Sequence, residues 1–97
     1  MYREMSAAEA AAQLPNMSVL DVREEYEAAQ GTLEGAVHIP LSELPVRLGE
    51  LSDSRTHLVV CQNGVRSAMA TELLSQYGYE AVNLTGGLKD WTGDWQR

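Results

Sequence analysis

A short apolar run at residues 58–60 leads directly into the only cysteine of the chain, Cys61, which opens a polar loop before a helical segment that starts near Arg66. Apolar runs without polar alternation are typical of strands that are covered on both faces. Such strands belong to parallel sheets, whose strands are connected by helices. We therefore expect an α/β fold in which this strand is central. Cys61 then lies at the carboxyl end of the strand, where open sheets bind ligands.

The rest of the chain alternates between helical and strand patterns in the same way. Helices are predicted over residues 7–14, 24–30, 42–51 and 88–95 in addition to the segment after Arg66, and strands over residues 18–22, 36–39 and 81–84. Ser6 and Glu9 have the spacing of a capping box, which favours a helix start at this point. Leu44, Leu48 and Leu51 fall on one face of the 42–51 helix, as in an amphipathic helix.

Other side chains are interpreted as structural. Met69, Leu73 and Tyr77 recur at helical spacing after the loop, and Gly78 ends that helix. Trp91 and Trp95 are four residues apart, which predicts a packing stripe with Trp91 in the core. The acidic residues of the 24–30 segment, Glu24, Glu25 and Glu27, are expected to form a solvated helix face.

Length, charge and cysteine content limit the class of protein. Ninety-seven residues are enough for a single domain over residues 1–97. The net charge of −7 disfavours nucleic acid and anionic membranes as partners. One cysteine and two distant histidines form neither an internal disulfide nor a metal site. The sequence shows no apolar leader and no run of about 18 apolar residues, so we expect a cytoplasmic protein. We also expect it to be a monomer that uses no cofactor.

The residues after Cys61 suit an anion-binding loop. Gly64 permits a positive φ angle, and successive N–H groups at a helix N-terminus can surround a negatively charged sulfur. Arg66 adds a permanent charge with a fork geometry that suits oxyanions. Cys61 could instead be a small buried apolar residue, but packing alone requires neither the glycine nor the arginine. We therefore expect a thiolate nucleophile, which needs neither His38 nor His57 as a general base once its pKa is lowered.

The segment Cys61-x-x-Gly64-x-Arg66-Ser67 resembles the active-site loop of the rhodanese (sulfurtransferase) family. Two further segments in the correct order resemble the same family: residues 21–40, with Asp-Val-Arg-Glu and Gly-x-x-x-Gly-Ala-x-x-Ile-Pro, and residues 84–91, with Gly-Gly-x-x-x-Trp. Thr32 and Leu33 stand where the family usually has His-Ile. The resemblance implies the rhodanese three-layer fold, a five-stranded, mainly parallel central sheet with helices on both faces.

The resemblance also implies a function: sulfur moves from thiosulfate or a similar small anionic donor to cyanide or an external thiol, which could belong to a protein. Cys61 would carry the sulfur as a persulfide. The residues expected to hold the donor and the persulfide are Gln62, Asn63, Gly64, Val65, Arg66 and Ser67. Asp21 and Arg23, which follow another strand, could flank the pocket, and we interpret them as a structural ion pair that supports the site.

Two other functions use similar sequences. Related phosphatases and arsenate reductases place the arginine one residue further on, at Cys-x5-Arg, and the resulting wider ring fits a tetrahedral oxyanion. The spacing from Cys61 to Arg66 is Cys-x4-Arg, the sulfurtransferase size. Rhodanese-like modules that only bind partners commonly lack the cysteine, whereas this chain has it.

Overall fold

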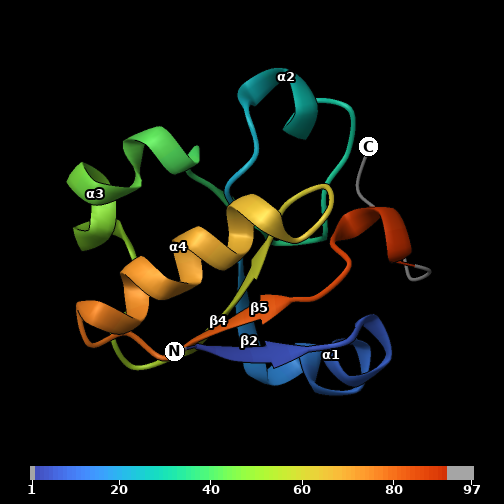
Figure 1. Cartoon of the computed structure of the whole chain (residues 1–97), viewed down its shortest axis with the longest axis horizontal. Helices are drawn as coiled ribbons and strands as arrows, with labels where there is room; N and C mark the ends of the chain where they lie inside the picture. The colour runs from blue at the N-terminus through green and yellow to red at the C-terminus, as the bar shows by residue number, and fades with distance from the viewer. Residues whose placement is uncertain (1, 92–97) are drawn as a thin grey trace.

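The computed structural model, which describes residues 2–91, contains one sheet of five parallel strands (Figure 1). The strands are β1 (Arg3–Met5), β2 (Met17–Asp21), β3 (Val37–His38), β4 (Thr56–Val60) and β5 (Ala81–Leu84). Their order across the sheet is β1-β5-β4-β2-β3, so the apolar β4 is central, as predicted. In register, Val59 of β4 lies between Leu20 of β2 and Asn83 of β5.

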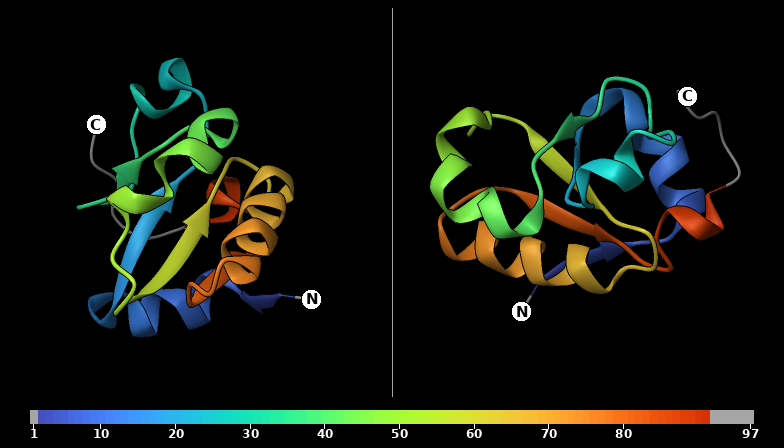
Figure 2. Two further views of the ribbon diagram at one scale, coloured as in Figure 1. Left: turned by 90° about the vertical axis from the view of Figure 1, so that its left-hand side faces the viewer. Right: turned by 90° about the horizontal axis from the view of Figure 1, so that it is seen from above.

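Helices cover both faces of this sheet, which confirms the three-layer architecture. The α-helices are α1 (Ala7–Gln13), α2 (Glu25–Ala28), α3 (Leu44–Arg47) and α4 (Val65–Gln76), and the 3-10 turns are η1 (Leu14–Asn16), η2 (Leu41–Glu43), η3 (Leu48–Glu50) and η4 (Leu88–Asp90). Figure 1 shows α1 and α4 on opposite sides of the strands, and Figure 2 shows the same layers from two further directions. Within residues 2–91 no helix is long and apolar enough to cross a bilayer.

The two faces of the sheet carry separate cores. Along β4, Leu58 and Val60 point into the core on the α1 side, whereas Val59 and Cys61 point into the core on the α3 and α4 side. Successive side chains of β4 therefore point to opposite faces of the sheet, although all of them are apolar from residue 58 to residue 60. Trp91 packs in the α1-side core, as predicted.

Two helix starts show how local sequence sets the elements. The predicted capping box of α1 is present: Ser6 Oγ accepts the Glu9 N–H at 3.2 Å, and Glu9 Oε1 accepts the Ser6 N–H at 2.9 Å. The helix predicted over residues 42–51 is instead divided into η2, α3 and η3. Pro45, at the start of α3, has no N–H with which to continue a helix from the preceding turn.

Other predictions of elements were incomplete. The sequence did not predict β1, because Arg3 and Glu4 are exposed and the strand pairs only with β5. Residues 88–90 form the single turn η4 rather than the start of a longer helix, and Trp91 is extended. Trp95 and the rest of the predicted 88–95 helix lie outside the described residues.

The buried face of α4 is not the row predicted from spacing. Met69 and Tyr77 are 59% and 65% exposed, and Leu73 is half-buried. The residues that face the sheet are Ser67, Ala70, Thr71 and Leu74. Three of these four are small, so the backbone of α4 can approach the sheet closely, and its N-terminal turn sits directly beside Cys61.

Candidate active site

Cys61 follows the last residue of β4, and its sulfur is held by the first turn of α4. The backbone N–H groups of Gly64 and Ser67 each donate to Cys61 Sγ at 3.2 Å. The Ser67 hydroxyl oxygen lies 3.3 Å from the same sulfur. Donors that converge on one sulfur stabilise its negative form, as the sequence led us to expect.

Gly64 makes this turn possible. Its φ angle is +90°, in the left-handed region that favours glycine, and it precedes the first residue of α4. A Cβ atom at this position would also lie 3.2 Å from the Gly86 nitrogen. The backbone conformation therefore favours the glycine of the Cys-x-x-Gly motif, and the chain after β5 leaves little room for a Cβ atom there.

The turn between β5 and η4 fixes the outer side of the loop. The Leu88 and Lys89 N–H groups donate to the Cys61 and Gln62 carbonyl oxygens at 2.8 and 3.0 Å. A Cβ atom at Gly87, whose φ angle is +75°, would collide with the Gln62 carbonyl. Because the loop carbonyls are bonded on this side, the loop N–H groups remain free to face the sulfur. Sequence reasoning used Gly86 and Gly87 only as part of the resemblance and did not identify this role.

The environment of the sulfur lowers its pKa. Burial of the sulfur raises the pKa of Cys61, but the hydrogen bond with the Ser67 hydroxyl and those from the N–H groups of Ser67, Asn63 and Gly64 together outweigh burial, so the net change is a decrease. Cys61 is fully buried. In the loop, only the side chains of Gln62, Asn63 and Val65 are exposed to solvent.

Arg66 is engaged by a residue far away in the sequence. Its Nη1 and Nη2 donate to Glu27 Oε1 and Oε2 at 2.6 and 2.9 Å, a two-point ion pair between α4 and α2. The bond to Arg66, with further hydrogen bonding from the Glu24 N–H, lowers the pKa of Glu27 to about 2 despite partial burial. The prediction that Glu27 belongs to a solvated acidic face was therefore wrong. The ion pair of Glu27 connects α2 to the first turn of α4, beside Cys61.

Asp21 and Arg23 form a buried ion pair at the end of β2. Arg23 Nη2 lies 2.8 Å from Asp21 Oδ2, and the two side chains are 4% and 0% exposed. Arg23 also donates to the Gly31 carbonyl at 2.7 Å, and the Thr32 hydroxyl donates to Asp21 Oδ2 at 2.9 Å. The pair anchors the segment between α2 and β3, and its support of the active site stays a prediction.

A further residue, which the sequence did not point to, approaches the sulfur from β5. The Ser67 hydroxyl donates to Asn83 Oδ1 at 2.5 Å, and Asn83 is 2% exposed. Asn83 Nδ2 lies 3.4 Å from the Gly64 carbonyl oxygen and from Glu4 Oε2. The only local signal was a polar residue within the apolar strand β5.

The two histidines lie in structural roles. His57 Nε2 is 2.6 Å from the Ser52 carbonyl oxygen, and the residue belongs to β4, upstream of Cys61. His38 Nε2 is 2.7 Å from the Arg23 carbonyl oxygen. Among residues 2–91 no group of three or more histidine, cysteine, aspartate or glutamate side chains is placed to hold a metal ion.

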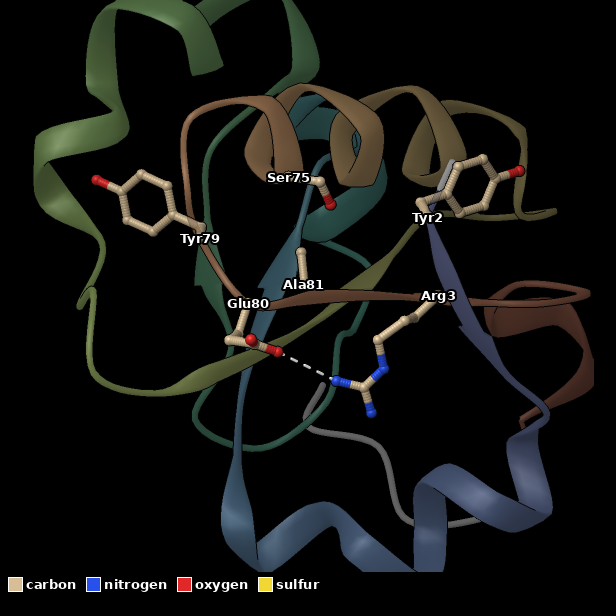
Figure 3. Close-up of a pocket in the computed structure, with 6 residues that line it drawn as sticks. All are labelled: Tyr2, Arg3, Ser75, Tyr79, Glu80 and Ala81. Carbon is tan, nitrogen blue, oxygen red and sulfur yellow. Dashed lines mark hydrogen bonds and ion pairs between the residues drawn. The ribbon is translucent and has the colours of Figure 1, made fainter.

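A separate surface hollow of about 410 Å³ lies where β1 and β5 begin (Figure 3). It is lined by Tyr2, Arg3, Ser75, Tyr79, Glu80 and Ala81. Arg3 and Glu80 are joined inside it by an ion pair of 3.2 Å. Because Ala81 is the first residue of β5, whereas Cys61 follows the end of the parallel β4, the hollow is not the thiol site.

The chain is similar to known proteins over most of its length. A family model described as "Rhodanese-like domain" matches residues 5–94. A protein named sulfurtransferase from Allochromatium vinosum is 36% identical over 74 residues, which are 75% of this chain and 69% of that protein. Thiosulfate sulfurtransferase PspE of Escherichia coli is 38% identical over 73 residues, 73% of this chain and 70% of that protein.

The solved structures agree with these matches. The crystal structure of a rhodanese-related protein from Thermoplasma volcanium has a TM-score of 0.95 and 35% sequence identity, and the match covers 98% of each chain. The chain spans a smaller share of some other relatives: 43% of one Bacillus subtilis protein and 60% of another.

Proposed function

The chain belongs to the rhodanese-like domain family, and we propose that it is a sulfurtransferase in which Cys61 carries the transferred sulfur as a persulfide. The observation that carries this proposal is the pair of N–H groups, from Gly64 and Ser67, that donate to the Cys61 sulfur at 3.2 Å. A thiol in this position loses its proton more readily than a free one, and the thiolate is the nucleophile.

The proposed donor is thiosulfate or a similar anion with a sulfane sulfur. The Cys61 thiolate attacks the outer sulfur, a new S–S bond forms, and the bond to the sulfonate sulfur breaks so that its electron pair leaves with sulfite. The outer sulfur then remains on Cys61 as a persulfide anion. The loop N–H groups that held the thiolate are positioned to stabilise that anion as well.

An external acceptor completes the reaction. The chain has one cysteine, so no second thiol of the same chain can resolve the persulfide. An acceptor thiolate or cyanide attacks the outer sulfur, the S–S bond to Cys61 breaks, and the Cys61 thiolate is regenerated. Because Cys61 is fully buried, the side chains that cover the sulfur must move before a donor or acceptor can reach it.

Arg66 is proposed to steady the anionic donor and the leaving sulfite while it remains attached to Glu27. The ion pair uses one N–H of Nη1 and one of Nη2, so the Nε–H group and the second N–H of each Nη can still donate to an anion. Glu27 then sets the direction of the guanidinium. Ser67 contributes its N–H group, which already faces the sulfur.

Intact-protein mass spectrometry after incubation with thiosulfate tests the proposal. We expect a gain of one sulfur atom on the parent protein, reversal of that gain by an added thiol, and no gain on Cys61→Ser. Hydrolysis of p-nitrophenyl phosphate is expected to be negligible. Efficient phosphate release without sulfur addition would assign the loop to the phosphatase class, and absence of both activities would favour a binding module.

A further inference from the structure

We propose that Asn83 is a positioning residue that holds the Ser67 hydroxyl turned away from Cys61 and thereby restrains formation of the thiolate. This inference rests on the proposed use of Cys61 as a nucleophile. Asn83 does not contact the sulfur; it acts through Ser67, whose hydroxyl oxygen lies 3.3 Å from Cys61 Sγ and 2.5 Å from Asn83 Oδ1.

The Ser67 hydroxyl has a single proton, which cannot serve both neighbours. A hydroxyl group donates one hydrogen bond and accepts others. Asn83 Oδ1 can only accept, so the hydroxyl proton is directed to it, and Ser67 Oγ is left to accept from the Cys61 S–H group. In this arrangement the S–H group of the protonated thiol has an acceptor in Ser67, and the Ser67 hydroxyl has an acceptor in Asn83. When the thiol ionises, the hydroxyl has to rotate toward the sulfur, and Asn83 Oδ1 loses its partner in a buried site, which is unfavourable.

The surroundings of Asn83 determine which end of its amide faces Ser67. Its Nδ2 lies 3.4 Å from both the Gly64 carbonyl oxygen and Glu4 Oε2. With the amide reversed, its oxygen would face a carbonyl and a carboxylate, both of which are acceptors only. The amide oxygen is therefore kept toward the Ser67 hydroxyl, where it competes with the thiolate for the same proton.

Other charged groups surround Cys61 on several elements, and most occur in pairs. Arg66 of α4 is paired with Glu27 of α2, and Asp21 is paired with Arg23 at the end of β2. Beyond these pairs, Glu4 of β1 reaches the site through Asn83, and Tyr26 of α2 interacts electrostatically with Arg66. A substitution at position 83 that removes no charge leaves these groups in place, so its effect reports the hydroxyl competition.

The experiment is a pH titration of the Cys61 thiolate, followed by ultraviolet absorbance and by the rate of alkylation with iodoacetamide. The chain has one cysteine, and subtraction of the Cys61→Ser spectrum removes the contribution of the tyrosines. Asn83→Leu removes the competing acceptor with similar side-chain volume. We expect it to lower the pKa of Cys61 by roughly one unit, and Ser67→Ala to raise it by roughly one unit.

A double mutant separates this role from a general structural one. In the Ser67→Ala background, Asn83→Leu is expected to have no effect on the titration midpoint, because the hydroxyl is gone. Thr71→Val is the matched control. It removes another buried hydrogen bond to Ser67, from Thr71 Oγ1 to the Ser67 carbonyl at 2.7 Å, without touching the Ser67 hydroxyl. We expect it to leave the midpoint unchanged.

The sign of the shift decides the outcome. If Asn83 supports the loop through the Gly64 carbonyl instead, its loss raises the pKa of Cys61, and that result, or an unchanged midpoint, overturns the proposal. Should circular dichroism show that Asn83→Leu does not fold, Asn83→Ala is titrated and judged by the same sign. The measurement involves no sulfur transfer. A protein that fails to accept sulfur from thiosulfate but shows these shifts would refute the proposed function and leave the role of Asn83 intact.

Discussion

The ion pair between Glu27 and Arg66 allows a quantitative test through Glu27→Gln. The substitution removes the charge but keeps an amide oxygen that can still accept the Glu24 N–H, which donates to Glu27 Oε1 at 2.9 Å. The pKa of Glu27 falls from 4.5 to about 2, which corresponds to an upper limit of about 3 kcal/mol. The side chains of Arg66 and Glu27 are 33% and 19% exposed, so screening by solvent reduces this to about 1–2 kcal/mol.

The melting temperature is expected to fall by about 4–16 °C at neutral pH, since each kcal/mol shifts the melting temperature of a domain of this size by roughly 4–8 °C. Glu25→Gln is the matched control, because it removes the same charge from an exposed position in the same short helix. We expect it to change the melting temperature by much less. Because Glu27 sets the direction of the Arg66 guanidinium, the KM for thiosulfate is expected to rise.

The effect of Glu27→Gln should depend on pH with a definite sign. Glu27 has a lowered pKa in the folded protein, so its contribution is complete above the unfolded value of 4.5 and is lost as the pH falls toward about 2. Urea unfolding of both proteins between about pH 3 and pH 7 measures the difference. A difference that vanishes at pH 7, or that is as large at pH 3 as at pH 7, would refute the assignment of this stability to the ion pair.

Three further substitutions test the support of the loop. Asp21→Ala leaves the buried Arg23 without its partner and is expected to cost about 3–5 kcal/mol of unfolding free energy in urea; parent-like stability with activity lost would instead make Asp21 catalytic. Gly87→Ala is expected to lower both the stability and the rate of Cys61 alkylation. Gly35→Ala is the control: Gly35 has the same φ angle of +75° but lies in open space, so this change should cost only about 1–2 kcal/mol of backbone strain. Equal effects of the two changes would exclude the collision with the loop. Arg66→Ala is expected to reduce sulfur transfer by about 10–100-fold, with only partial recovery in Arg66→Lys, because an ammonium lacks the planar fork; full activity in either variant would remove Arg66 from the mechanism.

Local sequence determined the order of most elements and the position of Cys61 in the fold. The apolar run before Cys61 predicted the central strand, and the Ser6–Glu9 box predicted the start of α1; both are confirmed. Patterns of this kind depend on hydrogen bonds and side-chain periodicity within a few residues, so they are readable without the fold. The position of Cys61 between a strand and the helix after Gly64 was accessible for the same reason.

Tertiary structure alone decided the contacts that tune the site. Glu27 and Arg66 are 39 residues apart, and no local pattern indicates that Glu27, rather than the exposed Glu25, pairs with an arginine of another helix. Asn83 reaches Ser67 only because β5 lies next to β4 in the sheet, and β1, with its exposed Arg3 and Glu4, forms only because β5 offers it an edge. Such contacts depend on strand order and on the parallel register of segments distant in the chain. The residues next to Cys61 in the sequence were therefore enough to single it out. The contacts around its loop, from Glu27 to Arg66 and from Asn83 to Ser67, depend on the packing of the whole sheet.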